Sequence, residues 1–141
     1  MFDFKFDWCK EMECGVAIID AQHRELFRIG RAMEQLIMNE CRNVSNRQLL
    51  DIVCELRDYI AYQFYTEEEL MKKYEYPNYS KHKKSLDDFK KHILSIDMTE
   101  LGIYPQKTLS QLKDDLQAFL FNHILIEDHE LCAFLNSHGE Y

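Results

Sequence analysis

The most constraining feature of this chain is a helical stripe that carries two polar residues among apolar ones. The side chains that share one helix face are Leu56, Tyr59, Ile60, Gln63, Phe64, Glu67, Leu70, Met71 and Tyr74. Their three- and four-residue spacing predicts an amphipathic helix turned toward a core. A buried carboxylate is costly unless it is paired or binds a metal. Glu67, and Gln63 one turn before it, therefore require partners from elsewhere in the chain.

Length and composition favour one helical domain over residues 1–141. A chain of this length buries a sizeable core without disulfide help, and 46% of its residues are hydrophobic. It holds only four glycines and two prolines, which is typical of helices joined by short connections. We therefore expect an all-α fold.

Charge and targeting signals narrow the possible partners. The formal net charge is −8, and the one dense lysine segment, residues 81–91, is expected to be the solvated face of a helix. Nucleic acid is therefore not an expected partner. No run approaches the ~18 apolar residues that span a membrane, and no secretory signal is visible. We expect a cytoplasmic protein with no membrane partner.

The cysteines form an odd set at irregular spacings, which predicts no disulfide framework. They are Cys9, Cys14, Cys41, Cys54 and Cys132. Cys9 and Cys14 resemble half of a zinc site, but no second cysteine pair follows. Reduced thiols are therefore expected, with Cys132 filling the core one turn beyond Asp128.

Helix-capping residues divide the first half of the chain into an N-terminal arm and two helices. Residues 1–19 are aromatic-rich and are expected to form an irregular arm that packs over an end of the bundle. Asp20 is the expected N-cap of the first helix. Ser45 and Gln48 form a capping box for a second helix over residues 46–74.

Two further helices are expected after the first proline. The third starts near residues 78–80, and the fourth starts at Pro105, a residue that suits a first helical turn. Residues 97–104 between them are expected to be a longer connection, and the fourth helix ends before Gly139. Four amphipathic helices with short loops predict an antiparallel up-down four-helix bundle over residues 20–138.

Every predicted helix carries at least one polar or ionisable residue on its apolar face. These residues are His23, Gln63, Glu67, His82, His123 and Asp128. Helix bundles build metal sites from inward side chains on facing helices. Three imidazoles and two carboxylates suit iron, manganese or zinc. The sequence therefore predicts a metal site made by all four helices.

The spacing of His123 and Asp128 does not fit one face of an ideal helix, because five residues turn the chain through about 140°. Glu127, four residues from His123, has the better spacing. A local π-type widening would bring Asp128 inward, and such bulges are frequent at functional sites. We expect Asp128 inside and Glu127 in solvent, a preference that the spacing alone does not dictate.

Over nearly its whole length the chain resembles the hemerythrins, in particular the single-domain bacterial ones. Residues 15–23 (GVAIIDAQH) are similar to the family's first-helix signature, and residues 64–71 (FYTEEELM) with Tyr76-Pro77 are similar to its second helix and turn. The third helix matches at His82 and Phe89, and the fourth at His123, Ile124 and Asp128. Together these motifs are far more specific than any one of them.

The resemblance implies a non-haem diiron centre that binds O2 reversibly, with two bridging carboxylates and histidines on each iron. By this resemblance Glu67 and Asp128 are the bridges. His23 would hold one iron, and His82 with His123 the other.

Two positions depart from the family pattern, one on each iron. Gln63 stands at the first histidine of H-x3-E, and Leu86 stands at the second histidine of H-x3-H. Gln63 can coordinate through its amide oxygen, whereas Leu86 cannot coordinate at all. We expect weaker metal binding and, if iron is bound, faster oxidation, because even changes outside the ligand shell commonly cost 10–100-fold in affinity.

Three functions are compatible with these residues. We expect a protein that binds O2 or a related small ligand for storage, delivery or sensing, rather than an enzyme. The alternatives are a metal-free or singly occupied bundle with a structural or interaction role, and a diiron enzyme of the oxidase or peroxidase type. A ferritin-like centre is set aside, because no histidine has a glutamate three residues before it.

Overall fold

The computed structural model describes residues 1–141, and it contains helices and turns but no strand. In chain order the helices are η1 (Lys10–Met12), α1 (Ala17–Met38), α2 (Asn46–Lys73), α3 (Tyr79–Leu94), α4 (Met98–Ile103), α5 (Pro105–Asn122), η2 (His123–Asp128) and α6 (His129–Ser137). The segment η2 is a π-helix that joins α5 to α6 in one continuous rod. The all-α fold predicted from composition is confirmed.

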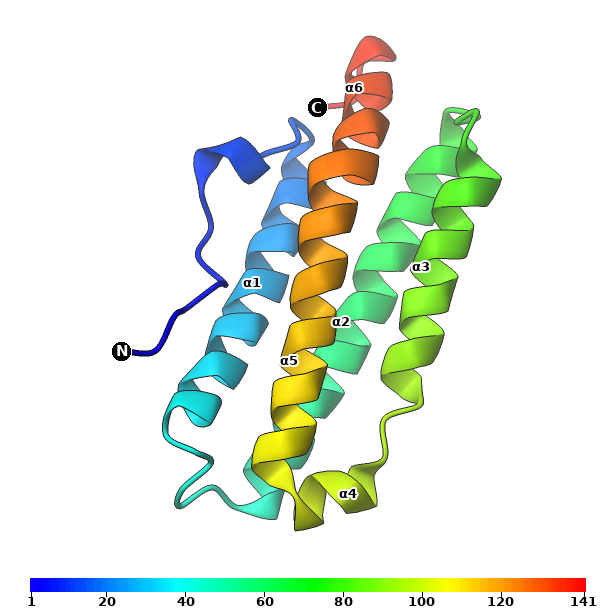
Figure 1. Cartoon of the computed structure of the whole chain (residues 1–141). Coiled ribbons are helices and arrows are strands. Elements are labelled where there is room, and N and C mark those ends of the chain that lie inside the picture. The colour runs from blue at the N-terminus through cyan, green and yellow to red at the C-terminus, as the bar shows by residue number, and fades with distance from the viewer.

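The long helices lie alongside one another as a bundle. In Figure 1 the chain descends along α1, returns along α2, descends along α3 and returns along α5, η2 and α6. α1 packs against α2 and α5, and α2 packs against α3. The apolar stripes predicted for these helices face this shared core, because their leucine, isoleucine and phenylalanine side chains are buried.

The first helix starts earlier than its capping signal indicates. α1 begins at Ala17, so Asp20 lies inside its first turn and is not the N-cap. The buried Asp20 carboxylate instead reaches back, where Oδ1 accepts the N–H of Cys14 at 2.7 Å and Oδ2 accepts the N–H of Gly15 at 3.2 Å. The expected boundary at residue 20 is therefore wrong by one turn, and the carboxylate fixes the segment that enters the helix.

The second helix is bounded as predicted. Ser45 and Gln48 form the complete capping box at its N-terminus. At the other end Glu75 adopts a positive φ of 52°, which ends the helix before Pro77. These boundaries place Gln63 and Glu67 on the buried face of α2.

The expected long connection at residues 97–104 is wrong, because most of it forms the short helix α4. Asp97 caps this helix by accepting the N–H groups of Thr99 and Glu100 at 2.9 and 3.1 Å. Leu101 is fully buried beneath it. α4 therefore closes one end of the bundle between α3 and α5, as Figure 1 shows.

The aromatic arm lies along α1 and does not cover an end of the bundle as expected (Figure 1). Phe6 is buried against Phe27, and its ring sits over Gly30, where a Cβ would lie only 2.4 Å from it. The buried carboxylate of Glu34 accepts the backbone N–H groups of Lys5 and Phe6 at 2.7 and 2.9 Å. These contacts hold the arm along the side of the helix.

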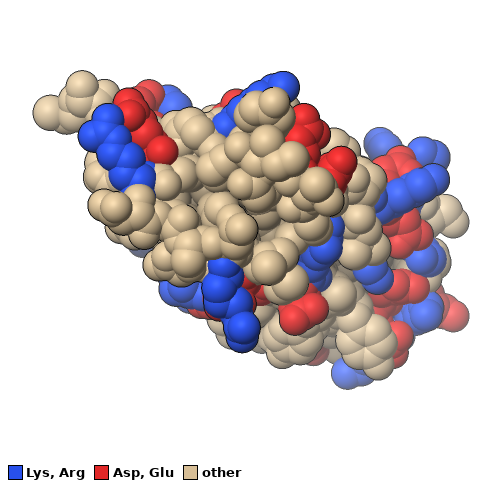
Figure 2. Space-filling view, turned by 90° about the horizontal axis from the view of Figure 1, so that it is seen from below, with Lys and Arg blue, Asp and Glu red and all other residues tan.

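The surface carries both signs of charge. Figure 2 shows lysine and arginine side chains interspersed with acidic ones, without a broad basic area on this face. Among the helices, none combines the length and the apolar character that a membrane crossing requires.

Candidate metal centre

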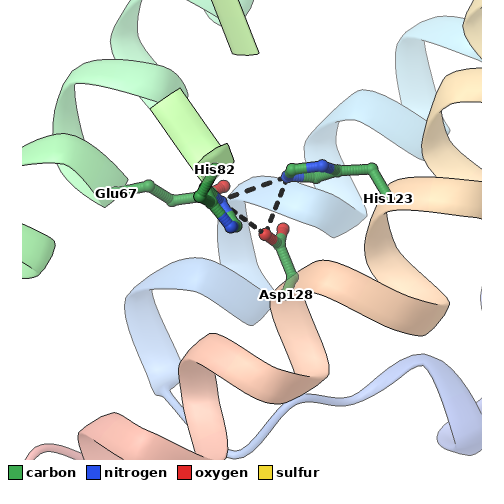
Figure 3. Close-up of side chains that lie close together, drawn as sticks. All are labelled: Glu67, His82, His123 and Asp128. Carbon is green, nitrogen blue, oxygen red and sulfur yellow. Dashed lines mark hydrogen bonds and ion pairs between the residues drawn. The ribbon is translucent and has the colours of Figure 1, made fainter. Parts of the chain in front are cut away.

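The six predicted site residues lie together in the core. α1 contributes His23, α2 contributes Gln63 and Glu67, α3 contributes His82, and η2 contributes His123 and Asp128. All six are buried, with at most 3% of any of them exposed. Figure 3 shows Glu67, His82, His123 and Asp128 converging on one point between the helices.

The π-helix expected from the five-residue spacing is present, and it brings Asp128 into the core. His123 and Asp128 both lie in η2, and their Nε2 and Oδ1 atoms are 2.8 Å apart. In an ideal α-helix these two side chains would point about 140° apart. The widened turn therefore lets both residues of the His-x4-Asp pattern share one site.

Glu67 faces histidines on two sides with its two oxygens. Oε1 lies 2.8 Å from Nε2 of His82 and 3.7 Å from Nε2 of His123. Oε2 lies 3.9 Å from Nε2 of His23 and accepts a hydrogen bond from Gln63 Nε2 at 3.0 Å. The carboxylate therefore spans the gap between one group made by His82 and His123 and another made by His23.

Asp128 spans the same gap. Its Oδ2 lies 2.7 Å from Nε2 of His23, while Oδ1 lies 2.8 Å from Nε2 of His123 and 3.2 Å from Nε2 of His82. Two carboxylates thus connect the same two groups of imidazoles. This arrangement is suited to hold two adjacent cations.

The three histidines and Asp128 hold each other in charged forms. Burial alone lowers the pKa of His23, but its close contact with Asp128 and the nearby negative charges raise it to about 10. For His82, burial is likewise outweighed by Asp128 and Glu67, which raise the pKa to about 9. The Asp128 charge outweighs burial at His123 and raises its pKa well above the ordinary value. Burial opposes ionisation of Asp128, yet the histidines hold its pKa well below the ordinary value.

The nitrogen and oxygen atoms of the cluster are better arranged to bind a metal than to hydrogen-bond with one another. Several buried atoms of the cluster have close neighbours but no well-directed hydrogen bond, namely Oδ1 and Oδ2 of Asp128, Nε2 of His23, Nε2 of His123 and Oε1 of Gln63. Buried polar atoms without such a bond are uncommon in folded proteins and require an explanation. Imidazole nitrogens and carboxylate oxygens around one point are typical ligands for iron, manganese or zinc.

Gln63 and Leu86, the two residues expected to stand in place of histidines, are both buried, on α2 and α3. Gln63 donates its amide to Glu67, which leaves its carbonyl oxygen without a partner and available as a ligand. Leu86 is buried on α3, one turn after His82, and offers only methyl groups. One side of the site is therefore apolar where an imidazole would add a donor.

The expectation that Glu127 is solvated is wrong. Its Oε2 lies 2.9 Å from Nδ1 of His123, and its Oε1 accepts the hydroxyl of Ser85 at 3.2 Å. The ion pair with His123 lowers the pKa of Glu127 despite its partial burial. The signal was present in the sequence, since Glu127 lies four residues after His123. A carboxylate on Nδ1 leaves Nε2 free to bind a metal.

Cys14 lies beside the cluster, a position that no local sequence pattern predicts. Its Sγ, a carboxylate oxygen of Asp20 and a ring nitrogen of His23 all lie within 4.8 Å of one another. The neighbouring Cys132 thiol and then His23 outweigh burial and lower the pKa of Cys14 to about 6. The arm and α6 meet here, and only the tertiary fold brings these residues together.

A small hollow leads from the surface toward His82. Its volume is about 20 Å³, and it is lined by Tyr76, Asn78, Lys81, His82, Glu127 and Glu130. A volume of this order holds a single water molecule. Access on this side therefore favours ligands of very few atoms.

Comparison with known proteins identifies the family of this chain. A family model described as the hemerythrin HHE cation binding domain matches residues 14–135. A bacteriohemerythrin of Clostridium acetobutylicum is 30% identical over 125 residues, which cover 89% of this chain and 97% of that relative. Similar proteins of the same name occur in Campylobacter jejuni, 31% identical over 83% of this chain and 85% of the relative, and in Stenotrophomonas maltophilia, 27% identical over 93% and 82%. With a match that extends over most of its length, this protein belongs to the hemerythrin family.

Proposed function

We propose that this protein is an antiparallel up-down four-helix bundle that binds O2 or a related small ligand at a modified non-haem diiron centre. One observation carries the proposal: three imidazoles and two carboxylates meet in the core, and buried polar atoms of His23, His123 and Asp128 have no hydrogen bond. Storage, delivery and sensing are all compatible with such a centre.

The two groups of side chains correspond to two metal positions. His23 would hold one iron, with the carbonyl oxygen of Gln63 available beside it. His82 and His123 would hold the other, and Glu67 and Asp128 would join the two. Iron held by these residues would supply the electrons that O2 binding requires.

The remaining residues of the site control access and polarity. Leu86 and Phe119 present apolar surface near the His82 and His123 side, and the Phe119 ring stacks on His123 with centroids 4.7 Å apart. Such a wall excludes water and larger ligands. Because Leu86 supplies no donor, the position beside it is left open for a small molecule.

The experiment that tests the proposal is elemental analysis combined with visible spectra of protein purified with and without air. Two irons per chain and a visible band that depends on O2 are the expected result. Catalytic turnover of peroxide or of nitric oxide would instead favour an enzyme of the oxidase or peroxidase type. Absence of metal after purification in iron-replete medium would refute the proposal.

A matched pair of variants tests the ligand assignment. Glu67→Ala removes a buried bridge and should abolish metal loading. Glu69→Ala, two residues away with half of its side chain exposed, should leave loading intact. Equal loading in the two variants would contradict the assignment of Glu67.

A metal-free role is the second candidate, and the ion pairs of the cluster favour it. Imidazolium groups at His23 and His82 lie 2.7 and 2.8 Å from carboxylate oxygens, so protons alone neutralise much of the buried negative charge. A bundle stabilised in this way could serve as a structural or interaction protein. It would retain its folded structure after exhaustive chelation and would show no change of melting temperature when iron is added.

A further inference from the structure

The segment just before α1 is held against α6 by two hydrogen bonds. The backbone oxygen of Glu13 lies 3.1 Å from Nε2 of His129, and the backbone oxygen of Gly15 accepts the amide of Asn136 at 3.0 Å. His129 and Asn136 are seven residues apart, so they lie on one face of α6 two turns from each other. Cys132 lies between them along that face.

Cys14 occupies the corresponding place on the opposing segment. Its backbone N–H is fixed by Asp20 Oδ1 at 2.7 Å. The next residue, Gly15, has a φ of +98°, and a Cβ there would lie 2.9 Å from Oδ1 of Asn136. The close approach of the two segments therefore requires glycine. It brings Cys14 to the face of α6 that carries Cys132, with the two thiols close enough for Cys132 to influence the pKa of Cys14.

The two thiols differ in access to solvent. Cys132 is fully buried, whereas Cys14 is only partly buried. A small oxidant from solvent therefore meets Cys14 first, with Cys132 directly behind it. Of the other cysteines, Cys9 and Cys54 are exposed, and Cys41 is partly buried in the turn after α1.

We propose that Cys14 and Cys132 are a redox-active pair that reduces hydrogen peroxide and becomes a disulfide. The sulfur of Cys14 attacks one peroxide oxygen, the O–O bond breaks, and the second oxygen leaves as water after taking up a proton. The sulfur of Cys132 then attacks the resulting sulfenic acid, an S–S bond replaces the S–O bond, and a second water leaves. Two thiols are oxidised and one peroxide is reduced to two waters. A dithiol reductant restores the pair.

The disulfide would join the arm to α6 beside the metal cluster. Asp20 and His23 follow Cys14 on α1, and Asp128 precedes Cys132 by one turn. Oxidation would therefore fix the relative position of two segments that adjoin the proposed ligands His23 on α1 and Asp128 in η2. The proposal goes beyond the diiron function and requires no metal, since peroxide is the only oxidant.

The test uses the full chain with Cys9, Cys41 and Cys54 changed to serine, so that only the proposed pair remains. The protein is treated with hydrogen peroxide in the presence of a chelator, unfolded, alkylated and weighed by mass spectrometry. We expect each chain to lose two hydrogen atoms and to take up no alkylating reagent. Dithiothreitol should restore two alkylated sites. Two alkylated sites after peroxide treatment, or a sulfinic acid at Cys14 with Cys132 still alkylated, would overturn the proposal.

Single variants separate the roles of the two sulfurs. In Cys132→Ser the sulfenic acid at Cys14 has no partner, and dimedone should label it at Cys14. In Cys14→Ser the buried Cys132 should remain reduced and be alkylated after unfolding. Dimedone labelling at Cys132 in preference to Cys14 would contradict the assigned order.

The parent protein is also mapped by peptide mass spectrometry, where a Cys14–Cys132 crosslinked peptide is expected, so the result does not depend on the folding of either variant. If no disulfide forms between Cys14 and Cys132, the diiron proposal is unaffected, because iron content is measured separately.

Discussion

Raising the pH from about 6.5 to 8.5 should strengthen metal binding to the metal-free protein steeply, because each imidazole must lose its proton before it can coordinate. His23 and His82 have pKa values of about 10 and about 9 in the metal-free cluster. At pH 7 the removal of these two protons costs about 7 kcal/mol, with about 1.36 kcal/mol for each pKa unit. The apparent affinity should therefore rise by about 100-fold for each pH unit in this range. His123, whose pKa is also raised, adds to the slope.

Calorimetric titration with Mn²⁺ or Zn²⁺ in two buffers of different ionisation enthalpy measures the protons released on binding. We expect a release of about two to three protons at pH 7, which is the number of protonated imidazoles that must become ligands. His92→Ala is the matched control, because His92 is an exposed residue that pairs with Asp115 away from the cluster. Its proton release should equal that of the parent. Release of fewer than about one proton by the parent would refute the charged state argued for the cluster.

The protonation of these histidines predicts that the stability of the metal-free protein and that of the metal-loaded protein respond differently to pH. The folded-state pKa values of His23 and His82 lie above the ordinary value of 6.5. Their contribution to the metal-free protein is therefore complete below pH 6.5 and is lost as the pH rises through 9 to 10. The depressed pKa of Asp128 gives a contribution that is lost in acid. The melting temperature of the metal-free protein should thus fall between pH 7 and 9, while that of the metal-loaded protein should not.

Three further variants test individual contacts. Glu127→Ala removes the carboxylate on His123 and should weaken metal binding about 10–100-fold in competition titrations, with Glu130→Ala as control. Gln63→His combined with Leu86→His should raise iron occupancy and increase charge-transfer absorbance in the visible spectrum. Gly30→Ala places a Cβ 2.4 Å from the ring that covers it. It should lower the free energy of unfolding in urea by about 1–3 kcal/mol through overpacking.

Each of these expectations has a clear contrary result. Equal metal affinity in Glu127→Ala and Glu130→Ala would mean that the contact to His123 does not influence binding. A double histidine variant that binds no more iron than the parent would show that Gln63 and Leu86 do not limit occupancy. Unchanged stability in Gly30→Ala would mean that Phe6 moves aside without loss of packing.

The long helices and the buried face of α2 with Gln63 and Glu67 could be predicted because local patterns determine them, whereas the spacing alone did not dictate that Asp128 points inward. The three- and four-residue spacing of apolar residues identified the buried faces, and the Ser45 capping box located the start of α2. Glu67 could be recognised because a carboxylate on such a face conflicts with its surroundings. Its role as a metal bridge remains a proposal.

The features that were missed depend on contacts between distant segments. The arm follows α1 because Glu34 binds two of its backbone N–H groups, which no local pattern reveals. Asp20 has the residue type of an N-cap but serves the segment in front of the helix. Cys14 and Cys132 are 118 positions apart in sequence, so their contact follows only from the packing of the arm on α6.

The π-helix explains why two consecutive acids can serve one histidine. In an ideal α-helix Glu127, four residues after His123, would take the position beside it, and Asp128 would point elsewhere. In η2 the Glu127 carboxylate lies at Nδ1 of His123, while Asp128 lies at Nε2. A carboxylate at Nδ1 holds the proton there and orients the ring, so the lone pair of Nε2 points toward the metal position. The pattern His-x3-Glu-Asp therefore supplies the proposed ligand, the residue that orients it and the proposed bridge, provided that the turn is widened by one residue.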